Sequence, residues 1–167
     1  DPPTSGGDTQ PAADINVPGD YATIQAAVNA AKDGDVIHVA AGLYKESVTV
    51  TDKTISIIGD SPKNTIISAE QSGRVINLTK GRSITLKRLT LKNGNVKDFE
   101  DKDTGYGLMA RGGAILIFAE NVLIEDCIFE SNYSQAGNHM MIAGENNVVK
   151  NCIFKSLGNE NLIMVDN

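Results

Sequence analysis

Apolar residues alternate in short runs along the chain, and within each unit the alternation shifts by one position. In residues 121–132, Val122 and Ile124 are followed by Cys127 and Phe129. Alternation is typical of a β-strand with one buried face, and the shift indicates a sharp corner between two short strands. A third apolar run precedes each strand pair, at residues 74–78, 114–118, 139–143 and 162–167. The pattern therefore predicts three short strands per unit.

The unit recurs along the chain. Cys152 stands 25 residues after Cys127 in a segment that aligns without gaps, and Leu89 and Ile66 take the same position in two earlier segments. Repeats of roughly 20–50 residues indicate a solenoid. We therefore expect an all-β fold, a right-handed single-stranded parallel β-helix with three short strands per rung. Inward-pointing columns are expected to contain Ile84, Leu86, Leu89, Leu91, Val122, Ile124, Cys127, Phe129, Cys152 and Phe154.

Charged residues at outward positions support this register. Lys87, Glu125 and Lys150 form one predicted column, and Lys92, Glu130 and Lys155 form another. Neighbouring rungs are about 4.8 Å apart, so side chains in one column meet directly. Both columns alternate in sign, which favours this alignment over others. Asn93, Asn132, Asn146 and Asn151 fall near corners, where Asn tolerates left-handed backbone and bonds the backbone.

The N-terminal part differs from the repeats. Residues 1–19 hold four of the five prolines and are predicted to be a tail or linker that lies on its own domain or on a neighbouring chain. Residues 20–167 form the β-helix domain. Apolar residues with helical spacing predict an amphipathic helix over 21–32, capped by Asp20 or Thr23 and covering the first rung.

From Val17 to Ala69 the sequence resembles pectin methylesterases and other β-helix proteins of the pectate-lyase-like superfamily. The shared phrases are GDYATIQAAVNAA, DVIHVAAGLYKESVTV and ISIIGDSPKNTIISA. A weaker resemblance, to polymorphic outer-membrane autotransporter adhesins, lies in Gly112-Gly113-Ala114-Ile115 and Phe129-Glu130-Ser131-Asn132. The first resemblance implies a β-helix fold and an enzyme of pectin chemistry.

The chain departs from pectin methylesterases at the positions that the resemblance makes catalytic. Those enzymes carry a Gln just before the strand that corresponds to residues 114–118, where this chain has Gly113. Their first catalytic Gln-Asp pair follows the strand that corresponds to residues 127–129, whereas residues 130–137 contain no Asp. Ester hydrolysis needs a base or nucleophile and an oxyanion stabiliser. We therefore expect no catalytic residues and lean against an enzyme, without deciding the question.

The insertion at residues 93–113 holds most candidate binding residues. Glu100, Asp101 and Asp103 are candidate ligands of a cation such as Ca²⁺, which prefers oxygen donors, and no other cofactor is expected. Asp98, Tyr106 and Tyr133 are candidate ligand-binding residues: the insertion could form the lip of a lateral groove, and the two tyrosines could stack on sugar rings. For the tyrosines, packing on their neighbours in a turn is the favoured interpretation. The spacing does not fit an EF-hand, and a solvated acidic loop is the favoured interpretation.

The cysteines and histidines receive structural roles. Cys127 and Cys152 are expected to stack on adjacent rungs as reduced, core-packed thiols, while a disulfide between them stays open. His38 and His139 have no evident catalytic partner in the sequence.

Two functions from different classes remain open. The favoured one is a secreted or cell-surface, non-catalytic module for adhesion, scaffolding or self-assembly, which associates with itself through an uncapped C-terminal rung and the N-terminal tail. The alternative is a pectinesterase- or lyase-like carbohydrate-active enzyme, or a fragment of one, acting on acidic polysaccharide. The net charge of −6 argues against nucleic acid as a partner, and no apolar run is long enough to span a membrane.

Overall fold

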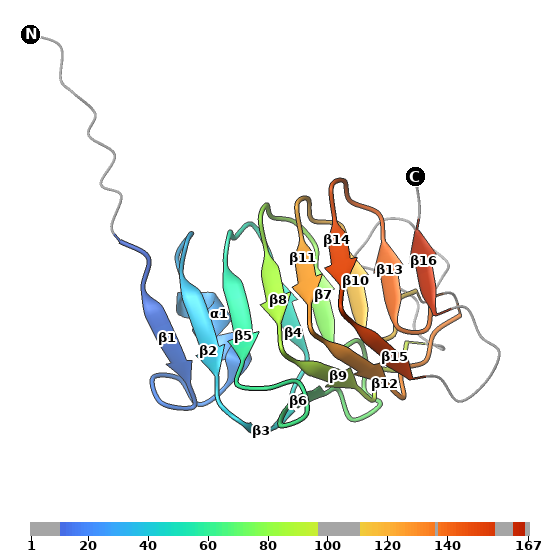
Figure 1. Ribbon diagram of the computed structural model, residues 1–167, viewed down its shortest axis with the longest axis horizontal. Helices are drawn as coiled ribbons and strands as arrows, with labels where there is room; N and C mark the ends of the chain where they lie inside the picture. The colour runs from blue at the N-terminus through green and yellow to red at the C-terminus, as the bar shows by residue number, and fades with distance from the viewer. Residues whose placement is uncertain (1–10, 97–110, 136, 156–161, 166–167) are drawn as a thin grey trace, which may run out of the picture.

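The chain winds as a solenoid of short parallel strands around one apolar core (Figure 1). The structure is a computed structural model, and it describes residues 11–96, 111–135, 137–155 and 162–165. Successive strands pass through three sheets in turn, and each strand pairs in parallel with its equivalent one rung away. The predicted parallel β-helix with three short strands per rung is confirmed.

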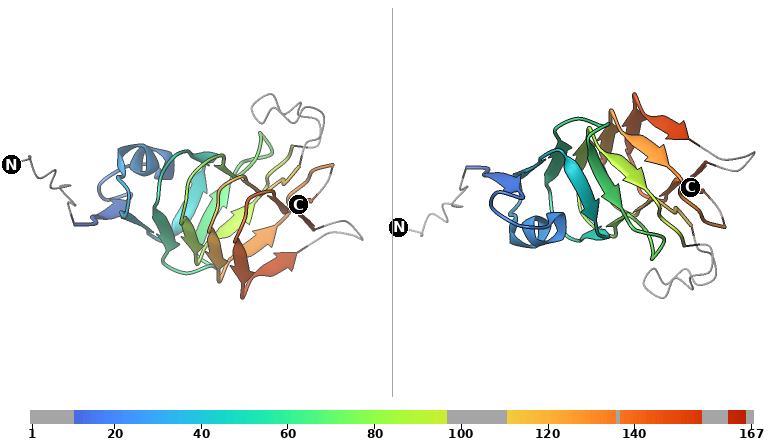
Figure 2. Two further views of the ribbon diagram at one scale, coloured as in Figure 1. Left: turned by 90° about the horizontal axis from the view of Figure 1, so that it is seen from above. Right: turned by 90° about the horizontal axis from the view of Figure 1, so that it is seen from below.

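The three sheets run along the long axis of the molecule, as Figure 2 shows from two further sides. Sheet A contains, in spatial order, β1 Asp14–Val17, β2 Val36–Val39, β5 Ser56–Gly59, β8 Thr85–Lys87, β11 Leu123–Glu125 and β14 Val148–Lys150. Sheet B contains β3 Gly42–Lys45, β6 Thr65–Ser68, β9 Thr90–Lys92, β12 Ile128–Glu130 and β15 Ile153–Lys155. Sheet C contains β4 Val48–Val50, β7 Ile76–Leu78, β10 Ile115–Ile117, β13 Met140–Ile142 and β16 Ile163–Val165.

The predicted inward columns form the core. Eight of these side chains are at most 1% exposed: Ile84, Leu86, Leu89, Leu91, Val122, Ile124, Cys127 and Phe129. Cys152 and Phe154 pack against the same core and are partly buried. Phe129 and Phe154 stack with ring centroids 4.8 Å apart, one rung above the other. The columns therefore extend through successive rungs, as the repeat predicts.

The predicted register is wrong by one residue in the first of the aligned segments, where Ile66 was expected in the column of Leu89. Ile66 pairs with Thr90 and Ile67 with Leu91, so Thr65 rather than Ile66 lies in the column of Leu89. Thr65 is completely buried, and its hydroxyl accepts a hydrogen bond of 3.1 Å from the backbone N–H of Asp60. Because this bond satisfies the hydroxyl, a polar residue can occupy an inward position.

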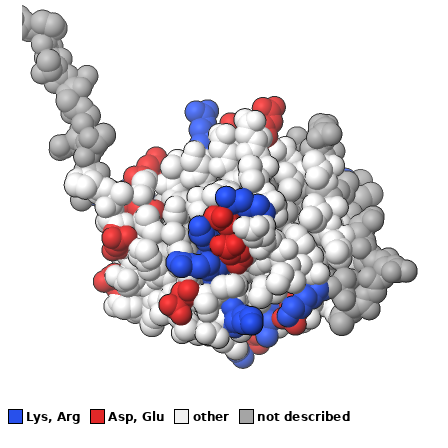
Figure 3. Space-filling model, in the orientation of Figure 1, with Lys and Arg blue, Asp and Glu red and all other residues white. Residues whose placement is uncertain are grey.

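The first charge column is present on the outer face of sheet A. Glu125 lies between Lys87 and Lys150, with ion pairs of 2.7 and 3.1 Å. Figure 3 shows the acidic and basic side chains that gather on this face. Hydrogen bonds from Lys87 and Lys150 lower the pKa of the Glu125 carboxyl below its usual value. The column thus joins three successive rungs through one carboxylate.

The second charge column has the predicted register on sheet B. Lys92, Glu130 and Lys155 are partners on adjacent strands. Within it, Lys155 and Glu130 are 3.8 Å apart, and both side chains are largely exposed. A long, exposed pair of this kind adds little stability.

The helix α1, Ile24–Ala30, covers the N-terminal edge of sheet C. Thr23 caps it through a hydrogen bond of 3.1 Å from the N–H of Ala26, which confirms one of the two predicted caps. The side-chain amide of Gln25 then pairs with the backbone of Thr49 in β4, accepting from its N–H at 2.7 Å and donating to its carbonyl at 3.1 Å. This amide bonds to β4 as a neighbouring strand would.

The predicted tail at residues 1–19 is wrong for its last part. Residues 14–17 form β1, which pairs in register with β2 and extends sheet A. Asp35 holds the residue before this strand in place. Its carboxylate accepts hydrogen bonds from the N–H groups of Ala13 and Lys32, both at 2.8 Å. These backbone bonds, that of Ala13 first, lower the pKa of the Asp35 carboxyl. Residues 1–10 lie outside the described residues.

Apolar side chains are exposed on the last strand of each sheet. Val148, Ile153 and Val165 are 50%, 54% and 59% exposed. They lie on β14, β15 and β16, whose outer edges pair with no further strand among the described residues. Self-association through this rung stays a prediction.

The Glu125 column generates a prediction for stability. Glu125→Lys places three cations in one column, so we expect a fall of several degrees in Tm at low salt. The difference should shrink at high salt, because salt screens charges at the surface. Thermal unfolding followed by circular dichroism at low and high salt measures both effects.

Glu145→Lys is the matched control, because Glu145 is exposed and its side chain makes no hydrogen bond or ion pair among the described residues. The pH dependence gives a second readout. The pKa of the Glu125 carboxyl is lower in the folded state than in the unfolded state, so its ion pairs stabilise the fold above the unfolded-state pKa of about 4.3. This stabilisation is lost as the pH falls through the pKa of the folded state. In Glu125→Gln, Tm should therefore fall less steeply as the pH is lowered than it does in the unchanged chain. Equal losses for Glu125→Lys and Glu145→Lys would contradict the column.

Candidate functional site

Most of the candidate binding residues lie outside the described residues. Asp98, Glu100, Asp101, Asp103 and Tyr106 fall in residues 97–110. The Ca²⁺ site and the groove lip proposed from them therefore stay predictions. Within the described ranges, no group of three or more His, Cys, Asp or Glu side chains is placed to hold a metal ion.

Tyr133 is described, and it lies in the corner between sheets B and C. Its N–H donates to the carbonyl of Gly94 at 2.8 Å, and its carbonyl accepts from the N–H of Val96 at 3.0 Å. Its backbone forms a parallel bridge with Asn95. These bonds stack the corner on the one before it, and the half-buried side chain keeps a ligand role as a prediction.

Gly113 lies in the same corner, where the backbone is too crowded for a side chain. A Cβ atom at this position would lie 2.5 Å from the carbonyl oxygens of both Asn138 and Tyr133. Contacts this short with backbone atoms require the corner itself to move. The glycine is thus required by close packing, and residue 113 cannot present a polar side chain in this backbone geometry.

A buried polar pair connects the neighbouring rungs at this corner. Asn132, 3% exposed, donates to the carbonyl of Leu91 at 3.0 Å and accepts from the N–H of Gly94 at 2.8 Å. Its amide nitrogen is also 3.1 Å from Nδ1 of the buried His139. The expected bonding of Asn132 to the backbone is confirmed, but Ser131 rather than Asn132 takes the left-handed conformation, with φ of 53°. The amide serves backbone groups, which indicates a structural role.

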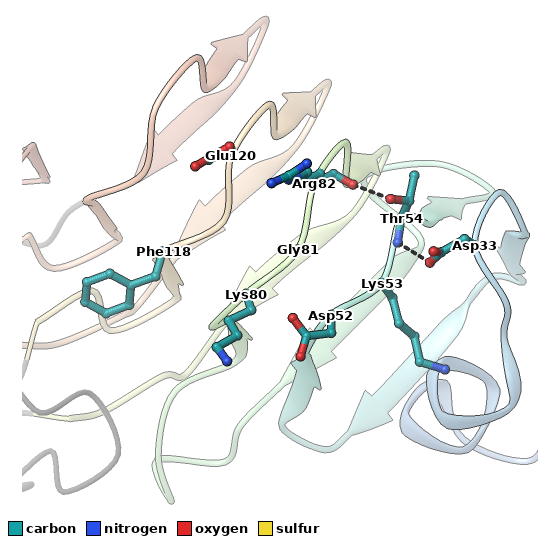
Figure 4. A pocket seen from close by; sticks show the side chains of 9 residues that line it. All are labelled: Asp33, Asp52, Lys53, Thr54, Lys80, Gly81, Arg82, Phe118 and Glu120. Atoms are coloured by element: carbon teal, nitrogen blue, oxygen red, sulfur yellow. Dashed lines mark hydrogen bonds between the residues drawn. The ribbon is translucent and has the colours of Figure 1, made fainter.

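A pocket of about 480 Å³ lies at the corner between sheets C and A. Three successive turns line it, each following a strand of sheet C, so the pocket extends along the axis of the β-helix. Its lining residues are Asp33, Asp52, Lys53, Thr54, Lys80, Gly81, Arg82, Phe118 and Glu120. Figure 4 shows Phe118, Lys80, Asp52 and Lys53 following one another along the pocket.

Some charges of the pocket are already used by the fold. Lys53 donates to the carbonyl of Asn29 at 2.9 Å and to that of Ala31, at the end of α1. Asp33 accepts a hydrogen bond of 2.8 Å from the N–H of Thr54. These contacts fix the turn at residues 51–55 against the helix.

Other charges of the pocket have no partner among the described residues. No ion pair or side-chain hydrogen bond engages Lys80, Arg82, Asp52 or Glu120 there. The backbones are nevertheless fixed, because Arg82 forms a parallel bridge with Glu120 and its carbonyl accepts from the hydroxyl of Thr54 at 2.7 Å. Two cations and two carboxylates are therefore held on rigid turns and stay available to a ligand.

None of the residues of this pocket was predicted as a site from the sequence. Its charged residues lie in separate turns at least 19 residues apart, and each turn has the composition of an ordinary polar loop. The signal was the repeat itself, because the turns after residues 48–50, 76–78 and 115–117 must stack in register. Aligning those turns places Thr51, Thr79 and Phe118 in one row and Asp52 beside Lys80 in the next.

Comparison with known proteins connects this fold to a family. The pectinesterase family profile matches residues 12–106, more than half of the chain. The chain belongs to the pectinesterase family. The resemblance to pectin methylesterases predicted from the N-terminal phrases is therefore confirmed.

Individual relatives agree with this assignment. The probable pectinesterase/pectinesterase inhibitor 23 of Arabidopsis thaliana is 33% identical over 106 residues, which cover 58% of this chain and 19% of that protein. Pectin methylesterase from carrot superposes with a TM-score of 0.54 at 23% identity, covering 87% of this chain and 53% of the carrot chain.

A second solved structure, a pectin methylesterase D178A mutant in complex with a hexasaccharide, superposes with a TM-score of 0.53 at 15% identity. It covers 84% of this chain and 49% of its own. The two structural neighbours support the fold. This chain thus spans about half the length of the solved relatives and about a fifth of the curated one.

Family membership changes the balance between the two functions. A pectinesterase-type β-helix domain agrees with the alternative of a carbohydrate-active enzyme, or a fragment of one, better than with the favoured non-catalytic adhesion module. Among the described residues no helix is long and apolar enough to cross a membrane.

Gly113 provides a prediction that tests the crowded corner. Gly113→Ala forces a Cβ against two backbone carbonyls, so we expect a loss of about 1–3 kcal/mol in the free energy of unfolding. Gly19→Ala is the control, because its Cβ would meet only ordinary contacts at 3.4 Å or more. Chemical denaturation gives both values, and an unchanged stability for Gly113→Ala would show that the corner has room.

Proposed function

We propose that this chain is the polysaccharide-binding β-helix of a carbohydrate-active protein of the pectinesterase family, and that its ligand is an acidic polysaccharide of the pectin class. The observation that carries the proposal is the corner pocket, which Lys80, Arg82 and Phe118 help to line, and in which both cations have no ion-pair partner among the described residues. Pectin-class polysaccharides lie outside cells, so the proposal also places the protein in the extracellular space.

The shape and chemistry of the pocket fit a linear uronate polymer. Three stacked turns extend the pocket along the axis, so consecutive sugar units can contact consecutive rungs. A guanidinium such as that of Arg82 binds a carboxylate through two parallel hydrogen bonds, and the Lys80 ammonium adds a second cation. Phe118 adds an apolar side chain to the lining, and such side chains are common in ligand pockets.

The acidic members of the pocket add selectivity. Asp52 and Glu120 accept hydrogen bonds from hydroxyl groups, which every sugar unit carries. They also repel carboxylates that approach out of register with Lys80 and Arg82, so the ligand's charges must match the positions of the cations. The hexasaccharide bound by a solved pectin methylesterase supports an oligosaccharide ligand for this fold.

Binding generates the central prediction. We expect Lys80→Glu and Arg82→Glu each to raise the Kd for de-esterified galacturonate oligosaccharides by about tenfold or more. The reason is that each substitution removes a charge-assisted hydrogen bond of about 1.5 kcal/mol or more. Isothermal titration calorimetry measures the affinities. Binding should also weaken at high salt.

Lys63→Glu is the matched control, since it makes the same charge change at an exposed position in a different corner. It should leave the Kd within about twofold of the unchanged chain, because a single distant surface charge is screened. Neutral oligosaccharides of the same length test the role of charge. Equal binding of neutral and acidic ligands, or equal loss in all three variants, would contradict the proposal.

A second prediction concerns ester hydrolysis. The chain should release no methanol from highly methyl-esterified pectin, because residue 113 is a glycine in a corner without room for a side chain and residues 130–137 contain no Asp. A coupled alcohol oxidase assay on the purified chain measures this. Methanol release above a heat-denatured control would show that the chain uses a different catalytic set.

A further inference from the structure

Two thiols lie directly over one another in the last two rungs that cross sheet B. Cys127 immediately precedes β12 and Cys152 immediately precedes β15. Ile128 and Ile153 are register partners, and the N–H of Ile153 donates to the carbonyl of Cys127 at 2.9 Å. Both cysteines are free thiols in the structure. The register therefore makes them direct neighbours across one rung.

The two sulfur atoms have equivalent surroundings. Sγ of Cys127 lies 3.3 Å from the carbonyl oxygen of Glu125, and Sγ of Cys152 lies 3.2 Å from that of Lys150. Each sulfur also lies 3.8 Å from a carbonyl oxygen of the rung before it, that of Leu86 or Ile124. The side chains thus point the same way at a rung spacing of about 4.8 Å. This spacing falls within the Cα separations of about 4.4–6.8 Å that disulfides span.

The two thiols differ in exposure and acidity. Cys127 is 1% exposed, whereas Cys152 is only partly buried. The hydrogen bond from the Cys127 thiol lowers the pKa of Cys152 to about 7. The same bond, followed by burial, raises the pKa of Cys127. Because the thiolate is the reactive form, Cys152 is the group that an external reagent meets first.

We propose that Cys152 and Cys127 form a thiol–disulfide exchange site, in which Cys152 is the attacking thiol and Cys127 the resolving one. The co-reactant is a small disulfide of the glutathione class. This proposal is independent of polysaccharide binding, because neither cysteine lines the pocket.

The reaction has two steps. The Cys152 thiolate attacks one sulfur of the small disulfide, forms a mixed disulfide and releases one thiolate. The Cys127 thiol then gives its proton to the departing second thiolate and attacks the Cys152 sulfur. The products are one Cys127–Cys152 disulfide and two small thiols, so atoms and electrons balance.

Oxidation would connect two rungs that the fold already holds in register. The bond closes a loop from 127 to 152, which contains β12, β13 and β14. Closing such a loop restricts the unfolded chain more than the folded one, so it stabilises the fold.

Oxidised glutathione tests the site on the full chain. Intact-mass spectrometry without reductant should show the loss of two hydrogen atoms and no retained glutathione. Cys127→Ala should instead keep one glutathione on Cys152, because the resolving thiol is missing. Cys152→Ala should stay unmodified over the same time, because Cys127 is buried. Circular dichroism of each variant confirms that it is folded.

Melting supplies an independent readout. The oxidised chain should unfold at a higher temperature than the reduced chain, and a reductant should reverse the shift. Cys152→Ala should show no shift. A stable glutathione adduct on the unchanged chain, a disulfide between two chains, or no reaction at all would each overturn the proposal.

Discussion

The rest of the structure depends on hydrogen bonding between each strand and its equivalent one rung away. These ladders fix the spacing at about 4.8 Å and bring every residue into contact with its counterpart in the neighbouring rungs. Like side chains then stack at inward positions, as Phe129 and Phe154 do, while opposite charges must alternate at outward positions, as around Glu125. The same constraint places Cys127 beside Cys152.

The pocket lies at a corner because the strands have little freedom to vary. A strand residue must fit the column above and below it, whereas a turn can change length and chemistry from rung to rung. The pocket arises from three such turns, and their backbones are held by the bridge between Arg82 and Glu120 and by the bond from Thr54 to Arg82. Rigid turns carrying unpaired charges are well suited to bind a ligand, because little order is lost on binding.

The sequence predicted most of the fold because period and polarity are local signals. The predicted register was wrong by one residue at Thr65. A threonine is normally expected on the outer face, and only its bond to Asp60 explains why this hydroxyl points inward. Residues 14–17 were predicted to belong to the tail, because the strand that they form depends on pairing with β2 and on the bond from Ala13 to Asp35, which no local pattern shows.

The candidate site was less predictable for a related reason. Gly113 could be recognised as a departure from the family, but the carbonyls that require a glycine come from Tyr133 and Asn138, about 20 or more residues away. The pocket likewise combines turns that no single window of sequence contains. A corner asparagine that bonds the backbone was predictable at Asn132, but its burial and its partners on another rung were not.

The side chain of Gln25 has a consequence for aggregation. The first strand of a sheet presents unpaired backbone groups, and such an edge is a template on which other chains add strands. At β4 the amide of Gln25 already occupies the N–H and the carbonyl of Thr49, and α1 covers the surrounding edge. One glutamine thus blocks strand addition at this end of sheet C, so an incoming polypeptide would first have to displace the helix.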